Sequence, residues 1–226
     1  MFVALRLITL PADRLRARES LVAALRAAAA DLPGMVSSWA APVASSLVLN
    51  AGHIVWRATF ATERDAVAAP YGPTWARIAP LLAGAQVEMV GYHVTRSVAR
   101  PRSGGVWRAL IFRVAPEGFP AVARELEQNL LLFPKYISSI RSWALSNVVT
   151  SQGPKAFTHV WEQEFDDIAG FTGEYMQHPI HWGLVDAYFD AEYPQYVVDP
   201  QLIQAVAEID LPVLGAHAAS SKEAQS

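Results

Sequence analysis

Tyr175 and His181 have the side-chain types and the close spacing of an acid–base pair. A neutral imidazole can accept a proton near neutral pH, and a phenol can donate a hydrogen bond to an oxygen on which negative charge develops. Together the two groups could remove a proton from a carbon beside a carbonyl group and stabilise the resulting enolate. We therefore interpret His181 as a general base and Tyr175 as its partner. The alternative is that His181 is a hydrogen-bonded core histidine and Tyr175 a packing residue.

His159, the third catalytic candidate, lies in an alternating run that is typical of a strand, with Trp161, Gln163 and Phe165 on its face. It could orient a substrate carbonyl, or it could fill the core with a hydrogen bond to the backbone. Trp161 could line a pocket for a flat apolar substrate, and Trp182, further along the chain, could form the rim of that pocket.

A strand followed by a broken helix is predicted to position these residues. Asp166-Asp167 supplies a helix start, and 168–177 has the pattern of a short helix. Pro179 cannot continue that helix but is favoured at the first position of a new one, which we expect to run to Tyr188. His181 would then lie in a first turn, where the helix macrodipole disfavours the imidazolium. Tyr188 lies on the same apolar side, so we include it among the substrate-binding candidates.

His178 and His181 are three residues apart, which suggests a metal site only faintly. No third ligand is evident and Pro179 interrupts a regular helical spacing, so we predict no metal and interpret His178 as an outward cap residue. The chain has no cysteine, which excludes disulfides, thiolate catalysis and Cys-bound metals. It also has no glycine-rich nucleotide-binding motif, and so we predict no cofactor.

The composition indicates a globular protein with large apolar cores. Of the 226 residues, 52% are hydrophobic and 17% are charged, which suffices for one large domain or two smaller ones. The net charge of −3, without any Lys/Arg run, gives no support to a nucleic-acid partner. No apolar run approaches the roughly 20 residues of a membrane span, and the N-terminal segment does not resemble a signal peptide. We therefore expect a cytoplasmic protein without membrane attachment.

The order of elements occurs twice along the chain. In the first half we predict a strand at 2–10, a helix at 11–32, extended segments at 35–50 and 53–60, a helical region at 62–82 and a strand at 86–98. In the second half we predict a strand at 106–114, a helix at 119–133, an extended segment at 136–150, the strand and broken helix described above, and a short strand at 196–198. The halves are thus 1–98 and 106–199, joined by a polar linker at 99–105 and followed by an extension at 200–226. Within that extension we expect a helix at 200–209 and disorder at 218–226.

Residue patterns support a duplication. Phe133-Pro134-Lys135-Tyr136-Ile137-Ser138-Ser139 corresponds to Leu32-Pro33-Gly34-Met35-Val36-Ser37-Ser38, and the spacing of Trp161 and Phe165 repeats that of Trp56 and Phe60. Two halves with β-α-β-β-α-β order imply a tandem repeat. Each half would form a four-stranded antiparallel sheet with helices on one face. The bare faces would pack on each other and form a barrel within one chain.

The second half resembles the dimeric α/β-barrel stress-responsive proteins, and in particular the olivetolic acid cyclase type of plant polyketide cyclase. The matching residues are Phe157-Thr158-His159-Val160, Phe165, Tyr175-Met176-Gln177-His178-Pro179-Ile180-His181, Gly183 and Asp186-Ala187-Tyr188. The resemblance implies an α+β fold of two ferredoxin-like repeats, with a cavity between each sheet and its helices. It also implies that Tyr175 and His181 promote an intramolecular aldol closure, and that His159 is the strand histidine of those cyclases.

One departure from the family concerns the substrate. Where the cyclases have a further pocket histidine, this chain has Ala109, flanked by Arg108, which we include among the substrate-binding candidates. The first half departs further. Tyr71 corresponds to Tyr175, but no His-Pro-x-His segment follows it, and Ile54 takes the position that corresponds to His159. We therefore predict one competent site, in the second half.

Three functions remain open on the sequence. The first is a cofactor-independent enzyme of the cyclase or lyase type, which performs an aldol-type cyclisation or a related lyase or isomerase step on an aromatic or polyketide-like carbonyl compound. The second is a cofactor-free monooxygenase of an aromatic polyketide. The third is a non-enzymatic, stress-responsive protein that binds hydrophobic ligands. In each case the partner is a small hydrophobic or aromatic compound, and a homodimer of the tandem barrel is left open.

Overall fold

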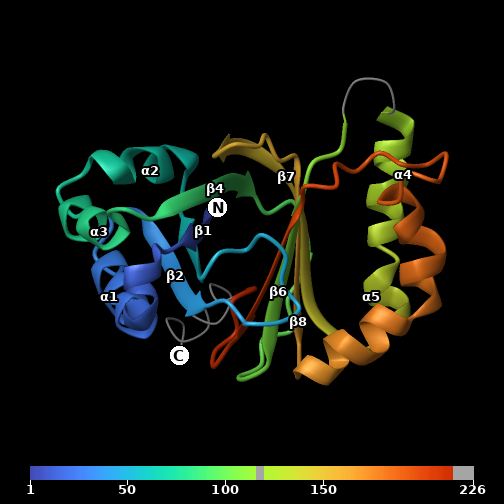
Figure 1. The fold of residues 1–226 in the computed structure, drawn as a ribbon, viewed down its shortest axis with the longest axis horizontal. Coiled ribbons are helices and arrows are strands. Elements are labelled where there is room, and N and C mark those ends of the chain that lie inside the picture. Colours follow the sequence, from blue (N-terminus) through green and yellow to red (C-terminus); the bar gives the residue numbers. More distant parts are fainter. Residues whose placement is uncertain (116–119, 216–226) are drawn as a thin grey trace, which may run out of the picture.

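Two layers of strands face one another in the fold, and helices cover the outer side of each layer (Figure 1). The structure, a computed structural model, describes residues 1–115 and 120–215. The tail predicted at 218–226 and the first residue of the helix predicted at 119–133 lie outside the described residues. Within the described part, no helix is both long and apolar enough to cross a membrane.

The elements of the first half follow the predicted order. They are β1 (Phe2–Thr9), η1 (Ala12–Ala17), α1 (Arg18–Ala29), β2 (Met35–Pro42), β3 (Ile54–Phe60), α2 (Glu63–Ala68), η2 (Ala69–Tyr71), α3 (Trp75–Leu82), β4 (Gln86–His93) and the short β5 (Arg96–Val98). Helix α2 begins at the side chain of Thr62, which accepts a hydrogen bond from Asp65 N at 3.1 Å. Prolines 70 and 73 divide this helical region, as expected from their missing backbone donor.

The second half contains the elements of the candidate site. They are β6 (Val106–Phe112), α4 (Pro120–Leu130), α5 (Phe133–Tyr136), β7 (Ile140–Gln152), β8 (His159–Phe165), the π-helical segments η3 (Gly170–Tyr175) and η4 (His181–Val185), the 3₁₀ turn η5 (Asp186–Tyr188) and β9 (Ile203–Glu208). The broken helix is confirmed, because helical residues run over 168–177 and again over 179–188. The widened π turns within it were not predicted.

The strands form one large antiparallel sheet in the order β2-β3-β1-β4-β7-β8-β6-β9, with β5 also paired to β7. Strands β4 and β7 join the halves at four residue pairs, with a register shift between Gly91 and Tyr92. The predicted closed barrel of two separate sheets therefore differs from the observed pairing, which is one continuous and open sheet. The observed fold is mixed α+β and is consistent with a ferredoxin-like arrangement.

The open edges of the sheet lie near one another. In the described residues, the two edge strands β2 and β9 do not pair with each other. The segment that follows β2 nevertheless contacts β9. Ala44 N donates to Val206 O at 2.8 Å, and Leu49 and Gln204 exchange backbone hydrogen bonds of 2.9 and 2.8 Å. These few bonds connect the two edges without continuous strand pairing.

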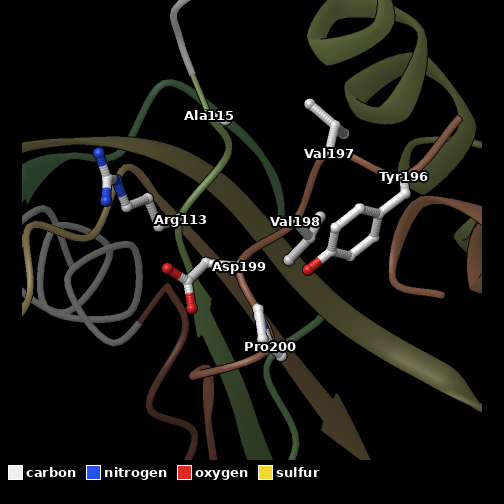
Figure 2. Close-up of a pocket in the computed structure, with 7 residues that line it drawn as sticks. All are labelled: Arg113, Ala115, Tyr196, Val197, Val198, Asp199 and Pro200. Atoms are coloured by element: carbon white, nitrogen blue, oxygen red, sulfur yellow. The ribbon is translucent and has the colours of Figure 1, made fainter. Parts of the chain in front are cut away.

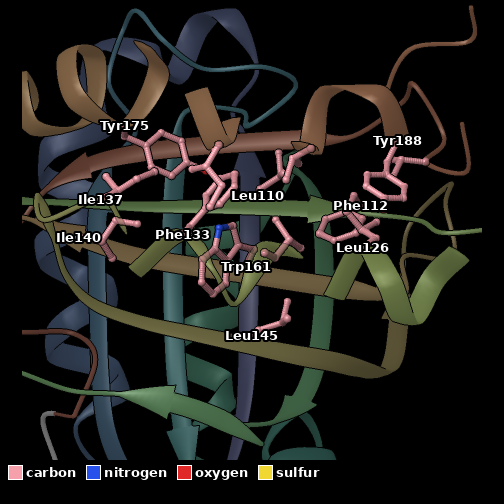
Figure 3. Packing of buried hydrophobic residues seen from close by; sticks show 14 of the residues in the cluster. Leu110, Phe112, Leu126, Phe133, Ile137, Ile140, Leu145, Trp161, Tyr175 and Tyr188 are labelled. Carbon is pink, nitrogen blue, oxygen red and sulfur yellow. The ribbon is translucent and has the colours of Figure 1, made fainter. Parts of the chain in front are cut away.

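Three clusters of apolar side chains fill the layers. One lies between the first-half strands and their helices and includes Trp56. Another lies between the second-half strands and their helices and includes Phe133 and Trp161 (Figure 3). The third contains side chains from both halves, such as Val55 and Trp107. Successive residues of a strand point to opposite faces, so each half has one face toward its helices and one toward the other half.

The helix predicted at 200–209 is wrong. Ile203–Glu208 is strand β9, which pairs with β6 from Ile203 opposite Ile111 to Glu208 opposite Val106. The segment contains good helix formers, but β6 offers an unpaired edge, and pairing with it buries Ile203, Ala205, Val206 and Ala207. The short strand predicted at 196–198 is reduced to a single bridge between Val198 and Val114.

Candidate active site

Tyr175 and His181 lie at the ends of two π-helical segments that meet at the Pro179 break. Tyr175 is the last residue of η3 and is 1% exposed, and His181 is the first residue of η4. Their rings pack edge to face with centroids 5.2 Å apart. A π turn widens the helix and is frequent at functional sites. The break therefore brings the two candidates into contact although each belongs to a different helical segment.

Arg108 connects this pair to the sheet. It lies on β6, is 3% exposed and points toward the helices. Its Nη1 donates to Tyr175 Oη at 3.1 Å and to Gln163 Oε1 at 2.7 Å, and its Nη2 donates to Gln204 Oε1 at 2.7 Å. No acidic side chain of the described residues forms an ion pair with Arg108. The guanidinium is thus a buried cation that is held by neutral groups alone.

A cavity of about 210 Å³ lies among these groups. Its polar wall consists of Arg108, Tyr175, His181, Asp186 and Gln204, and its apolar wall of Leu110, Leu130, Phe133, Met176, Val185, Phe189 and Leu202. This volume is below the roughly 300 Å³ at which pockets for drug-sized ligands begin, so the space suits a small compound. A mostly apolar cavity with a few convergent polar groups is typical of a binding or catalytic site.

The electrostatics of the cavity keep His181 neutral. Burial is the main cause that lowers the pKa of His181; Arg108 lowers it further, while the carboxylate of Asp186 opposes the change. Asp186 Oδ1 lies 3.4 Å from His181 Nδ1, so a proton on Nδ1 would leave Nε2 free as the basic nitrogen. Burial also lowers the pKa of Arg108, although a guanidinium stays protonated in proteins.

The hydroxyl hydrogen of Tyr175 has no acceptor among the described residues. The hydroxyl oxygen accepts the hydrogen bond from Arg108. A buried donor of this kind normally has a partner. The Tyr175 hydroxyl can therefore donate to an oxygen placed in the cavity, and the bond from Arg108 makes it a stronger donor.

The structure does not bring His159 to this cavity. His159 lies four residues before Gln163 on β8, which is about 13 Å along the strand. Its Nδ1 lies 2.7 Å from Thr158 Oγ1 and its Nε2 lies 3.0 Å from Glu127 Oε1, and its ring stacks on Phe112. Burial lowers the pKa of His159, against the opposing effect of Glu127. These contacts make His159 a hydrogen-bonded core residue, although its partners are side chains and not the backbone of the stated alternative.

Three predicted substrate-binding residues also lie outside the cavity. Trp161 is fully buried in the core (Figure 3). Its ring centroid lies 5.7 Å from that of Trp143. Tyr188 is buried, and its hydroxyl accepts a hydrogen bond from Asn129 Nδ2 at 2.9 Å; burial, with the nearby carboxylate of Glu125, raises the pKa of Tyr188 to about 12. Trp182 is 61% exposed and donates to the backbone of Gln177, so it is not a rim of this cavity.

Arg108 and Ala109 point to opposite faces of β6. Ala109 belongs to the cluster between the halves, so the position that differs from the cyclase pattern does not face the cavity. Arg108 does face it, as expected of a substrate-binding residue.

Sequence reasoning missed Gln163, Gln204 and Asp186 as members of the site. Gln163 was detectable, because a polar residue on the face of Trp161 and Phe165 must find a buried partner. Gln204 was not, because its segment was assigned to a helix. Asp186 lies five residues after His181, a spacing that α-helical geometry does not favour but that a π turn allows.

The first half lacks the pair. Ile54, which takes the position that corresponds to His159, packs in the core beneath the helices. His53 accepts a hydrogen bond from Leu10 N at 2.9 Å. Tyr71, the counterpart of Tyr175, is 88% exposed.

A further surface pocket, of about 360 Å³, lies where β6 ends, between Arg113 and the segment 196–200 (Figure 2). Arg113 and Asp199 are its charged groups, and Tyr196 lies at its edge. None of the catalytic candidates lines it.

Comparisons with known proteins agree with this fold. Residues 106–199 match the Dabb family, described as "Stress responsive A/B Barrel Domain". No curated protein matches the chain. Among solved structures, an anthrone oxidase-like protein is similar with a TM-score of 0.67 and 12% identity, over 92% of this chain and 90% of that chain. A protein from Fusobacterium nucleatum, provisionally assigned as a monooxygenase, is similar with a TM-score of 0.60 and 9% identity, over 93% and 91% of the two chains. A chlorite dismutase variant from Candidatus Nitrospira defluvii is similar with a TM-score of 0.56 and 10% identity, over 97% and 94%. At these identities the likeness concerns the fold alone.

Proposed function

We propose that the second-half cavity is the active site of a cofactor-independent enzyme that removes a proton from a carbon beside the carbonyl of a small aromatic or polyketide-like compound. One observation carries the proposal. A buried Arg108 without an acidic partner donates to Tyr175 Oη, whose own proton is free beside the neutral imidazole of His181. This is the arrangement that enolate formation requires.

Each group has a distinct role in that step. The substrate carbonyl oxygen accepts the hydroxyl proton of Tyr175 as a hydrogen bond, and the charge of Arg108 stabilises the negative oxygen that forms. His181 takes the proton from the neighbouring carbon, and Asp186 stabilises the imidazolium that results. Gln163 and Gln204 hold the guanidinium without neutralising it. The apolar walls exclude water and strengthen these interactions.

The enolate carbon would then attack a second carbonyl carbon of the same molecule. A carbon–carbon bond forms, the second carbonyl becomes an alkoxide, and His181 returns its proton to that alkoxide. This closure involves no net oxidation, so it needs no oxidant or reductant. The matching Tyr-x-x-His-Pro-x-His segment supports this aldol-type fate.

A cofactor-free monooxygenase is the second candidate, and the likeness to an anthrone oxidase-like protein and to a protein provisionally assigned as a monooxygenase favours it. The same first step serves this reaction. The enolate of an electron-rich aromatic compound reduces O₂, a carbon–oxygen bond forms, and loss of water leaves a new carbonyl. One CH₂ group and one O₂ thus give one C=O group and one water molecule, without an external reductant.

We also infer that the chain arose by duplication of one ferredoxin-like unit. The order β2-β3-β1-β4 in the first half parallels β7-β8-β6-β9 in the second, with β9 in the position of β4. The second unit would then extend beyond 199 to Glu208. The cluster shared by both halves and the bonds between the sheet edges support a barrel that is closed by packing more than by pairing.

Two assays distinguish the fates of the enolate. A linear phenyl triketone reports ring closure by chromatography, and anthrone reports oxidation through O₂ uptake and quinone formation. We expect His181→Ala to lower whichever turnover is found by about 10²- to 10⁴-fold, the usual contribution of a general base. His159→Gln is the matched control, because His159 lies outside the cavity, and it should retain turnover.

Unchanged turnover in a folded His181→Ala variant would overturn the proposal. Binding of both compounds without conversion of either would instead support the non-enzymatic ligand-binding function.

A further inference from the structure

A second cavity, of about 320 Å³, lies in the first half between the sheet and helices α2 and α3. Its walls are mostly apolar side chains of β1, β4 and the helices. Thr150 and Gln152, both on β7 of the other half, supply a polar edge. Arg6 is the one charged side chain among the described residues that line it, so the cavity contains a positive charge and no carboxylate.

The Arg6 side chain is buried, and no acidic side chain of the described part of the chain forms an ion pair with it. It is 4% exposed, and its Nη1 has no hydrogen-bond partner among the described residues. The guanidinium carbon lies 4.7 Å from the ring centroid of Trp56 and 5.3 Å from that of Trp75. Glu88, on the neighbouring strand, is paired in register with Leu7 and lines the space between the halves, so it points away from Arg6.

A lone buried cation is costly to fold, and it is usually balanced by an anion. The two indole rings contact the guanidinium at distances typical of cation–π interactions, which take up none of its N–H donors. Since Nη1 has no hydrogen-bond partner among the described residues, a planar acceptor can bind there, and a carboxylate matches a guanidinium with two parallel hydrogen bonds. Burial lowers the pKa of Arg6 to about 10, so the side chain remains protonated at neutral pH.

This site is not a copy of the one in the second half. Arg6 is opposite Trp56 in the sheet, whereas Leu110 is opposite Trp161 and Arg108 is opposite Gln163. Arg6 therefore lies two residues along the strand from the position that corresponds to Arg108. Arg6 and Arg108 therefore do not occupy corresponding positions, and the presence of Arg6 does not follow from the repeat.

We propose that the first-half cavity binds a small carboxylate with a flat apolar body. Its carboxylate pairs with the guanidinium of Arg6, and its ring packs against Phe2 and Trp75. Thr150 and Gln152 offer hydrogen bonds to a polar substituent. The site is independent of the enolate chemistry of the second half.

Binding of 2-naphthoate, followed by quenching of tryptophan fluorescence and by calorimetry, tests the proposal. The Arg108→Met background removes the guanidinium of the other cavity, so that the signal reports on Arg6. We expect 2-naphthoate to bind there, with 2-naphthalenemethanol, its neutral analogue, about tenfold to a hundredfold weaker. Adding Arg6→Met should abolish this preference, and adding Arg6→Lys should weaken it because lysine cannot form the bidentate pair.

Two results would overturn the site: equal affinity for the acid and the alcohol, or naphthoate binding that Arg6→Met leaves unchanged. Should Arg6→Met not fold, the comparison of acid and alcohol together with the Arg6→Lys variant decides the question. Failure here leaves the second-half proposal intact, since Arg6→Met alone should not change turnover there.

Discussion

Arg108 is the residue on which the candidate site depends. Its side chain is buried, it donates to Tyr175, Gln163 and Gln204, and no carboxylate among the described residues balances its charge. Burying a charge without an ionic partner is costly, so the charge is not explained by stability. It is explained if negative charge develops in the cavity during the reaction.

The Tyr175 hydroxyl should contribute to rate and little to stability. We expect Tyr175→Phe to lower kcat by about 10²- to 10³-fold, as is usual when one donor to a developing oxyanion is removed. Tyr188→Phe is the matched control, because that hydroxyl is buried but bonded to Asn129 outside the cavity. Steady-state kinetics on both variants, with circular dichroism to confirm the fold, checks the difference. Equal effects of the two substitutions would contradict the assigned role.

The pH profile should report His181 as a base. Its pKa is lowered from 6.5, chiefly by burial, so the imidazole is neutral at pH 7 and becomes protonated only in more acidic solution. The reaction requires the neutral form, so kcat/KM should be flat around pH 7 and fall as the pH drops through that lowered pKa. A profile that falls by half above pH 6.5 would be inconsistent with His181 as the base.

The sequence identified Tyr175 and His181 as a pair and Arg108 separately, and all three line one cavity. It could not identify which other candidates join them. His159, Trp161 and Gln163 share one strand face, and none of them lines the cavity. Gln163 belongs to the site because it accepts a hydrogen bond from Arg108, a contact that the strand pattern alone does not reveal. Trp182 follows His181 directly and yet faces solvent, because adjacent helical residues point in different directions.

At the level of elements, the site depends on a break and on a strand. The break at Pro179, flanked by π turns, orients Tyr175 and His181 toward each other, and the sequence predicted the break from the proline. The strand is β9, which supplies Gln204 and which composition assigned to a helix. Its conformation is decided by the free edge of β6, a tertiary partner that no local pattern reveals.

Gly91 should be required for the junction of β4 and β7. A Cβ atom there would lie 2.6 Å from Phe2 Cζ and would also meet the Thr150 side chain, so Gly91→Ala needs a local shift. We expect it to lower the free energy of unfolding by about 1–3 kcal/mol, as overpacking does. Gly173→Ala is the control, because no atom beyond its chain neighbours and its own helical backbone lies within 4 Å of its added Cβ. Urea denaturation of both variants measures the difference, and a Gly91→Ala variant as stable as the control would refute the tight junction.

Across the whole molecule, a buried ionic network joins the halves. Arg57 of β3 pairs with Glu162 of β8, with Nε–Oε1 at 2.8 Å, and Tyr92 and Trp107 donate to the same carboxylate at 2.8 and 3.1 Å. The carboxylate of Glu162 raises the pKa of Arg57 despite the opposing effect of burial. Arg57 follows Trp56 as Glu162 follows Trp161, so corresponding positions of the two halves have opposite charges. The sequence repeat predicted that the two halves face each other. The ion pair between Arg57 and Glu162 could be identified only from the structure.

Breaking that pair should destabilise the whole chain. Glu162→Gln leaves Arg57 buried without its counter-charge, and we expect a loss of about 3–5 kcal/mol in the free energy of unfolding. The double variant Arg57→Met/Glu162→Gln should recover part of it. Asp31→Asn is the control, because its partner Arg77 lies 2.8 Å away on the surface, where such pairs contribute about 0–1 kcal/mol. Urea denaturation measures the free energy of unfolding of each variant. If Glu162→Gln lowered it no more than Asp31→Asn does, the network would not stabilise the association of the halves.

Deuterium exchange measures proton removal by His181 without any later reaction step. The exchange of the protons beside the carbonyl of 2-tetralone, followed by NMR in D₂O under argon, measures enolate formation whatever its later fate. We expect exchange well above the buffer rate with the wild-type protein, and exchange at the buffer rate with a folded His181→Ala variant. Equally fast exchange with that variant, or none above buffer with the wild type, would contradict proton removal by His181.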